Sequence, residues 1–316
     1  MIHTVTLNPS LDRTVEVDAF EPGSVLRARC VARGAAGKGV NLARGLVALG
    51  VPCTAAALAG RWEKPFFRSE LARLGAEPVL VSGGGATRAN ETVIERSTGR
   101  VTHLRERGAA AGRSHLSRLA RALLARVRVG DLAAVCGSAP PGLPEGAFAE
   151  FLGKLRAAGA TLLVDTSGEA LAEAASVRPE VLTPNAGELA ELARERPGSP
   201  GEAARLARAL LDESRDAGAS ELVVVTLGAE GAVAVTTREA WHARCPVSEI
   251  VSPIGAGDAL NAGLVAARAA GASLGEALRR AVACGAANCM EASAGTLDPA
   301  RVEVLAGRAE VRELTL

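Results

Sequence analysis

Residues 255–258, Gly-Ala-Gly-Asp, place a carboxylate inside a glycine-rich turn that leads into an apolar helix. Such a turn presents unpaired backbone N–H groups and the positive end of the helix dipole, and both attract anions such as phosphate. The carboxylate of Asp258 would repel a phosphate unless it accepts a proton from a group that approaches the phosphate. A simpler interpretation is that Asp258 only caps the helix, because Asp is a preferred N-cap residue.

A second glycine-rich turn, GAAGKGVN at residues 34–41, precedes another apolar helix. It is not a Walker A loop, because only two residues separate Gly34 from Gly37 and a glycine, not Ser or Thr, follows Lys38. No GxGxxG motif follows the first strand pattern, so the dinucleotide fingerprint of an oxidoreductase is absent. Only three of the 36 basic residues are lysines. Lys38 therefore suggests that a compact ammonium group is needed in this turn.

The elements that would position these turns alternate from about residue 114 onward. Apolar runs such as LAAVCGS, TLLVDTS and ELVVVTLG are separated by amphipathic segments, one of which predicts a helix near residues 201–217. Short buried strands that alternate with helices are typical of parallel βαβ units. The sequence therefore predicts an α/β fold with a doubly wound, mostly parallel sheet.

Small and polar residues follow several of these apolar runs. The carboxyl ends of parallel strands form the ligand-binding edge of such a sheet, so these residues are candidates for a site. The Ser, Asn and Gly residues among them are also common in turns and helix caps. The candidates are Gly137, Ser138, Asp165, Thr166, Ser167, Pro184, Asn185, Glu188, Thr226, Leu227 and Gly228.

The first hundred residues follow a different pattern. Residues 14–20, 25–33 and 87–107 alternate apolar and polar side chains, which is typical of strands with one or both faces exposed. We expect a small β-sheet that acts as a lid over the site, built from about residues 10–34 and 85–108. The whole chain, 1–316, is then one α/β domain with this lid.

The overall charge and hydropathy favour a small-molecule ligand. A net charge of +1 gives no electrostatic attraction to nucleic acid or to an anionic membrane. No apolar run reaches 18 residues, and the N-terminus has no signal-peptide pattern, so we expect a cytoplasmic protein without a membrane span. The six cysteines form no CxxC pair, which predicts buried free thiols and no disulfide or zinc site.

Seven short motifs occur in a fixed order along the chain. They are TLNPSLD, GAAGKGVN, a Thr-Arg pair in a mid-chain strand, CGSAPPG, TPNAGE, TLGAEGA and GAGD. In this order they resemble the PfkB, or ribokinase-like, family of carbohydrate kinases, from about residue 2 to residue 298. The resemblance is greatest to the phosphosugar branch, which includes 1-phosphofructokinases, tagatose-6-phosphate kinases and minor 6-phosphofructokinases.

The resemblance implies an ATP- and Mg²⁺-dependent kinase and gives the 255–258 turn a role. By this resemblance Asp258 is the base that takes the proton of the acceptor hydroxyl, while the N–H groups of Gly255, Ala256 and Gly257 neutralise the transferring phosphoryl group. The resemblance therefore favours a general base at Asp258 over a residue that only caps the helix.

The resemblance also assigns the remaining candidates. Asn185 and Glu188 match the N-x-x-E motif that acts on the magnesium ion, although the same spacing fits a capping box. For the acceptor, Arg88 matches a lid arginine that pairs with the substrate's own phosphate, although an arginine in solvent would look the same. The nucleotide loop is matched by Thr226, Gly228 and Gly231, and the sugar site by Asp12, Gly37, Lys38, Gly39, Asn41 and Ser138.

Three departures from the family concern the acceptor. Phosphosugar members often carry Lys-Pro-Asn where this chain has Thr183 before Pro184. His103 stands where some 6-phosphofructokinases have a second phosphate-binding arginine, although Arg105 and Arg107 are close in the sequence. Residues 60–62, Gly-Arg-Trp, replace the usual Gly-x-Asp-like turn. We expect fructose 1-phosphate as acceptor, followed by tagatose 6-phosphate or fructose 6-phosphate. The alternatives are a kinase of an unphosphorylated sugar or nucleoside and a sugar-binding protein without turnover. Strands of the lid could also pair two subunits into a homodimer.

Overall fold

The computed structural model describes residues 1–212 and 221–315. A central sheet dominates it, with the strand order β14-β13-β12-β11-β10-β9-β8-β1-β4-β5 among the described residues. The strands from β5 to β11 in this order are parallel, and β12, β13 and β14 continue the sheet as antiparallel strands. The strands are β1 Ile2–Thr6, β4 Cys53–Ala59, β5 Glu77–Ser82, β8 Leu132–Cys136, β9 Thr161–Asp165, β10 Val181–Leu182, β11 Leu222–Thr226, β12 Ala232–Val235, β13 Ala240–Arg244 and β14 Glu310–Glu313.

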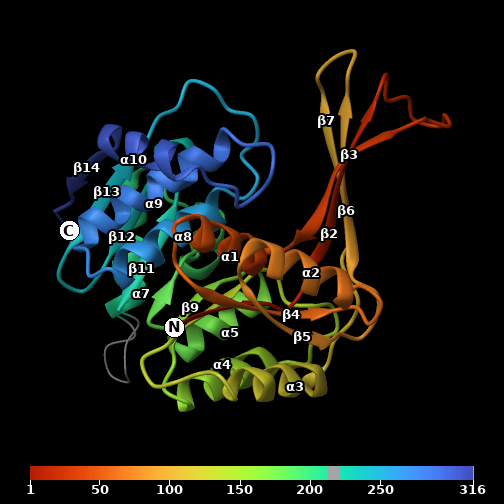
Figure 1. Ribbon diagram of the computed structural model, residues 1–316. Coiled ribbons are helices and arrows are strands. Elements are labelled where there is room, and N and C mark those ends of the chain that lie inside the picture. The colour runs from red at the N-terminus through yellow and green to blue at the C-terminus, as the bar shows by residue number, and fades with distance from the viewer. Residues whose placement is uncertain (213–220, 316) are drawn as a thin grey trace.

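Helices cover both faces of this sheet (Figure 1). One core contains side chains of α3 to α7, and two others contain side chains of α1, α2, α8 and α9 from the opposite face. The helices are α1 Lys38–Ala48, α2 Lys64–Leu74, α3 Arg113–Leu124, α4 Ala147–Ala157, α5 Glu169–Val177, α6 Ala186–Ala193, α7 Pro200–Asp212, α8 Ala256–Ala269, α9 Leu274–Cys289 and α10 Pro299–Arg308.

The strand β11 is apolar from Leu222 to Val225 because both of its faces are buried. Val223 and Val225 pack against the helices of one face, whereas Leu222 and Val224 pack against those of the other. Successive side chains of a strand point to opposite faces, so a strand covered on both sides needs no polar residue. The expectation of a doubly wound, mostly parallel sheet is confirmed. Of the helix predicted near 201–217, residues 213–217 lie outside the described residues.

A small second sheet stands out from the body beside α1 and α2 (Figure 1). It has the order β3-β2-β6-β7, with β2 and β6 parallel and the two outer pairs antiparallel. A small apolar cluster of Val15, Val17 and Val93 supports it. Its strands are β2 Ser10–Val17, β3 Arg29–Ala36, β6 Arg88–Glu95 and β7 Val101–Arg105.

The cysteine prediction was only partly right. All six thiols are free, and Cys53, Cys136 and Cys284 are buried. Cys30, however, is exposed, because β3 is an edge strand of the small sheet and residues 29–33 face solvent. Cys245 and Cys289 are partly exposed. Among the described residues, no helix combines the length and the apolar character needed to cross a membrane.

Candidate active site

The turn at residues 255–258 begins α8, and Asp258 is not its cap. The N-cap is Gly255 at φ 87°, and Asp258 is the third residue of the helix. A Cβ on Gly255 would lie 2.7 Å from the Cα of Ala294, so both the left-handed backbone and the close approach require glycine. Ala256 N donates to Pro253 O over 3.3 Å, whereas no described acceptor bonds the N–H groups of Gly255 and Gly257.

The turn before α1 lies against the end of β1. A Cβ on Gly37, which has φ 122°, would lie 2.6 Å from Thr6 Cγ2, and a Cβ on Gly39 would lie 2.6 Å from Val5 O. Farther along α1, Gly45 lets the helix approach α8, since a Cβ there would lie 2.7 Å from that of Ala262. These glycines bring the first turns of α1 and α8 together.

Asp258 and Asn41 meet at this contact between α1 and α8. Asn41 Nδ2 donates to Asp258 Oδ2 over 2.8 Å, and Arg44 Nη1 donates to Asn41 Oδ1 over 3.1 Å. Burial and the nearby Asp165 carboxylate raise the pKa of Asp258 to about 7, although Asn41, Lys38 and Arg44 oppose the shift. A buried carboxylate that titrates near neutral pH is suited to act as a general base.

Lys38 is paired with Asp165 at the carboxyl end of β9. Lys38 Nζ lies 2.7 Å from Asp165 Oδ1, and the lysine side chain remains 39% exposed. Burial alone would lower the pKa of Lys38, but the carboxylates of Asp165, Glu188 and Asp258 together outweigh burial, and the net shift is upward. Lys38 therefore keeps its charge and presents a cation next to Asp258.

A buried amide holds the other oxygen of Asp165. Asn261 Nδ2 donates to Asp165 Oδ2 over 3.0 Å and to Thr183 Oγ1 over 3.2 Å, while Asn261 Oδ1 has no partner among the described residues. Sequence reasoning missed Asn261 and Arg44, and it noted Asp165 only as a residue after a strand. The available signal was the spacing of three residues from Asp258 to Asn261 and from Asn41 to Arg44, which places each pair on one helix face.

Asn185 and Glu188 form a capping box at the start of α6. The side chain of Asn185 accepts bonds from the N–H groups of Gly187 and Glu188, and Glu188 Oε2 accepts the Asn185 N–H over 2.8 Å. Burial raises the pKa of Glu188.

The site beside Glu188 fits a magnesium ion that is held by few protein ligands. The described residues contain no group of three or more His, Cys, Asp or Glu side chains that could enclose a metal ion. Mg²⁺ usually keeps several waters and is held by one or two carboxylates and the substrate phosphates. Glu188 Oε1, which no described residue bonds, suits that role.

The predicted nucleotide loop follows β11. Thr226 N donates to Pro184 O over 3.0 Å, so this loop lies beside the Asn185 capping box. Gly228 and Gly231 have φ 61° and 83°, and a Cβ on Gly231 would collide with Ala243 O. The described contacts do not join this loop directly to Asp258.

His242 supports the same loop from β13. Arg312 Nε lies 3.3 Å from His242 Nδ1, and because arginine can only donate, the imidazole proton is on Nε2. That nitrogen then donates to Glu230 O over 2.8 Å and holds the 3₁₀ turn Gly228–Glu230.

The predicted sugar site lies where β2 and β6 leave the body. Asp12 Oδ1 accepts bonds from Ser10 Oγ over 2.7 Å and from Asn90 Nδ2 over 2.9 Å. Ser138 Oγ accepts the side-chain amide of Asn8 over 3.2 Å. The Asp12 carboxylate opposes the burial that lowers the pKa of Arg44 and of Arg88, so its charge acts on both guanidinium groups.

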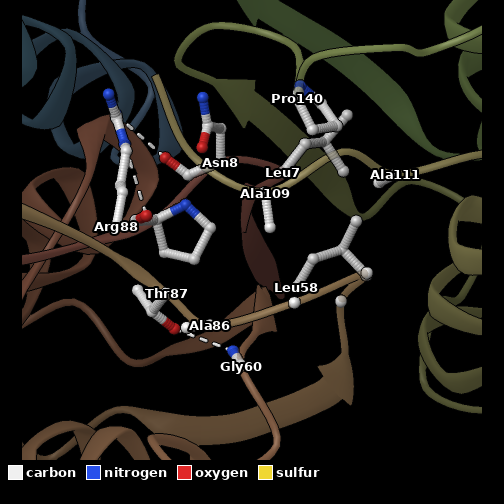
Figure 2. Close-up of a pocket in the computed structure, with 14 residues that line it drawn as sticks. Leu7, Asn8, Leu58, Gly60, Ala86, Thr87, Arg88, Ala109, Ala111 and Pro140 are labelled. Carbon is white, nitrogen blue, oxygen red and sulfur yellow. Dashed lines mark hydrogen bonds between the residues drawn. The ribbon is translucent and has the colours of Figure 1, made fainter. Parts of the chain in front are cut away.

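The side chain of Arg88 is hydrogen-bonded to backbone carbonyl groups. Its guanidinium donates to the carbonyl groups of Asn8, Glu106 and Pro9 over 3.0, 3.2 and 3.4 Å. Figure 2 shows the bond to Asn8. The cavity beside Arg88 in Figure 2 has a volume of about 20 Å³, which is room for about one water molecule and not for a sugar phosphate. In this conformation Arg88 fastens β6 to the segment between β1 and β2.

Comparison with known proteins shows similarity to carbohydrate kinases over most of the chain. The model of the pfkB family of carbohydrate kinases matches residues 5–301. Proteins named 1-phosphofructokinase from Rhodobacter capsulatus and Xanthomonas campestris are 36% and 35% identical, over 99% and 84% of this chain and 98% and 83% of their own length.

Solved structures of phosphofructokinases have a similar fold. Two structures of phosphofructokinase-2 from Escherichia coli are 27% identical and cover 97% of this chain and 98% of their own. One is a complex with fructose-6-phosphate, with a TM-score of 0.88, and the other is a tetrameric inhibited form, with a TM-score of 0.89. The chain therefore belongs to the pfkB family of carbohydrate kinases.

Proposed function

We propose that this chain transfers the γ-phosphoryl group of ATP, with Mg²⁺, to a hydroxyl group of a phosphorylated ketohexose, with fructose 1-phosphate as the preferred acceptor. The observation that carries the proposal is Asp258, a buried carboxylate with a pKa of about 7 in the first turn of α8. The relatives named 1-phosphofructokinase support the choice of acceptor. Tagatose 6-phosphate and fructose 6-phosphate are the next choices.

In this mechanism Asp258 takes the proton of the acceptor hydroxyl as its oxygen attacks the γ-phosphorus, and ADP leaves. The N–H groups of Gly255, Ala256 and Gly257 stabilise the charge on the phosphoryl oxygens, which requires the loose Ala256 bond to open. Asn185 and Glu188 would hold Mg²⁺, which would supply neutralisation of the phosphate charge. ATP is held by Thr226, Gly228 and Gly231, and the sugar by Asp12, Gly37, Lys38, Gly39, Asn41, Arg88 and Ser138.

One observation favours a second candidate, a kinase of an unphosphorylated sugar or nucleoside. Arg88 already bonds three backbone carbonyl groups. If these bonds persist with substrate bound, the arginine is less available to a substrate phosphate. A sugar-binding protein without turnover is the third candidate, and release of ADP separates it from both kinases.

The small sheet is proposed to serve as the lid of a single domain and as a dimer contact. Val31, Val101 and Leu104 are exposed on its outer strands, at 42%, 51% and 53%. β3 and β7 are its edges, and unpaired strand edges favour association with another chain. Because ATP and sugar phosphates are found in the cytoplasm, we propose that the enzyme works there.

The test is a panel of hexoses with ATP and magnesium, followed by ADP release. The panel contains fructose 1-phosphate, fructose 6-phosphate, tagatose 6-phosphate and the corresponding free sugars. The proposal predicts the highest kcat/KM for fructose 1-phosphate and a kcat that is about 10²- to 10⁴-fold lower in Asp258→Asn. A higher kcat/KM for a free sugar would support the second candidate, and no ADP release with any acceptor would contradict both.

A further inference from the structure

The hydrogen bonds around Asp258 distinguish its two carboxylate oxygens. Oδ2 accepts the Asn41 amide over 2.8 Å, whereas no described residue is hydrogen-bonded to Oδ1. An amide can turn either its oxygen or its nitrogen toward a neighbour, so its orientation must come from its other partner. For Asn41 that partner is Arg44, 3.1 Å from Oδ1. Arginine has only donors, so the Asn41 oxygen faces Arg44 and its NH₂ group faces Asp258.

We propose that Arg44 is a positioning residue for phosphoryl transfer: by fixing the Asn41 amide it commits Asp258 Oδ2 to a hydrogen bond and leaves Oδ1 to accept the substrate proton. The inference rests on the proposed function, because it concerns the same base. Arg44 itself is hydrogen-bonded to Asn41, Ala294 and Ala35, and it acts on Asp258 through Asn41.

The guanidinium of Arg44 is held firmly enough for this task. Nη1 also donates to Ala294 O over 2.5 Å, and Nη2 donates to Ala35 O over 3.0 Å. Ala35 is at the end of β3, and Ala294 is the residue against which Gly255 packs. Arg44 therefore ties the base of the small sheet, α1 and the support of the 255–258 turn together. A group whose rotamer is locked by such partners can position another accurately.

The charges around Asp258 give the expected direction of the electrostatic effect. Asp258 interacts electrostatically with Asp165 from β9, with Lys38 and Arg44 from α1, and with the Cys136 thiol from β8. Burial and Asp165 raise the pKa of Asp258, and the Asn41 bond and the two cations lower it. Loss of Arg44 removes one cation and frees the amide, so the pKa of Asp258 must rise.

The sign of the pH effect follows from the role of a base. Asp258 is active only when deprotonated, so the acid limb of kcat/KM reports its pKa in the free enzyme. We expect this limb near pH 7 in the unaltered protein. In Arg44→Met it should move to higher pH by about one unit. At its new optimum kcat should still be about tenfold lower, since a freed amide no longer fixes the carboxylate. KM for ATP should not change.

Two further variants separate charge from orientation. Arg44→Lys keeps a cation, but its single nitrogen does not reproduce the guanidinium bonds that fix the Asn41 amide. Its acid limb should therefore move to higher pH by less than that of Arg44→Met, while kcat falls. In Asn41→Leu the amide is already absent. Adding Arg44→Met to Asn41→Leu should therefore lower kcat at the optimum no further, because residues that act through one contact are not additive.

A matched control comes from α4. Arg156 donates to the carbonyl groups of Val177 and Arg178, as Arg44 does to two others, but it lies in a different part of the fold. Arg156→Met should lower thermal stability and leave the pH profile of kcat/KM where it is. This comparison removes the effect of simply losing an arginine that bonds the backbone.

The proton on Asp258 can also be followed without turnover. NMR titration of ¹³C-labelled aspartate carboxyl groups, with Asp258→Asn to assign the signal, should show a higher pKa in Arg44→Met. An unchanged pKa together with unchanged kcat would overturn the positioning role of Arg44. An additive loss in the double variant would overturn its action through Asn41. Absence of turnover with every hexose, with the NMR shift present, would instead contradict the proposed function.

Discussion

Replacement of Arg88 with alanine should have two separable effects. The guanidinium donates to three backbone carbonyl groups over 3.0, 3.2 and 3.4 Å. Only the two shorter bonds are well formed, and because the side chain is half-buried, water replaces part of their contribution. Their loss should cost about 2 kcal/mol of the free energy of unfolding. In a chain of this length that corresponds to a fall in Tm of about 3 °C.

The second effect concerns the substrate phosphate. If Arg88 leaves one carbonyl and grips that phosphate, the variant loses a charge-assisted contact of about 2 to 3 kcal/mol. The kcat/KM for fructose 1-phosphate should then fall by about 30- to 150-fold. The kcat/KM for free fructose should change little. Arg88→Lys should give an intermediate result, because an ammonium group keeps the charge but not the fork.

The assay is ADP release at saturating ATP for both sugars, with Tm measured on the same preparations. Arg100→Ala is the control, since Arg100 pairs with Glu95 over 2.7 Å at the turn between β6 and β7 and has no contact with the site. It should leave both kcat/KM values unchanged. Equal losses for the two sugars in Arg88→Ala would refute a phosphate contact and leave Arg88 with only its role in fastening β6.

Three other substitutions test the site. Asp258→Asn should lower kcat by about 10²- to 10⁴-fold while ATP binding, measured by calorimetry, is retained; near-normal turnover would exclude Asp258 as the base. Glu188→Gln keeps an acceptor for the Asn185 N–H, so the fold should persist while the magnesium concentration for half-maximal rate increases; an unchanged requirement would make Glu188 structural. Asn261→Val should lower kcat about tenfold, because it frees the Asp165 carboxylate that pairs with Lys38. Thr183→Val removes the other partner of the same amide and should not lower kcat, so equal losses in the two variants would refute a role of the Asn261–Asp165 bond in turnover.

The fold could be predicted because its signals are local. An apolar run such as LVVVT predicts a strand that is covered on both faces. The alternation of apolar and polar side chains predicted the half-exposed strands of the small sheet. The exposed Cys30 was missed because the rule that cysteines are buried is a statistical one. It does not apply to an edge strand with solvent on its outer face.

The site was predictable only in part, because its contacts depend on packing. The 255–258 turn is visible as a motif, but its cap is Gly255 and not Asp258. The bond between Asn41 and Asp258 joins residues 217 positions apart and requires the close approach of α1 and α8. The partners of Arg88 have no signal in the sequence at all, since every residue has a backbone carbonyl group.

The most direct test of the proposed function is the ratio of kcat/KM for fructose 1-phosphate to that for fructose, measured by ADP release with ATP and Mg²⁺. A site that recognises the substrate's own phosphate should give a ratio of at least about 30, the lower value expected for one charge-assisted contact. A ratio near one, or turnover of fructose alone, would contradict the assignment of a phosphorylated acceptor.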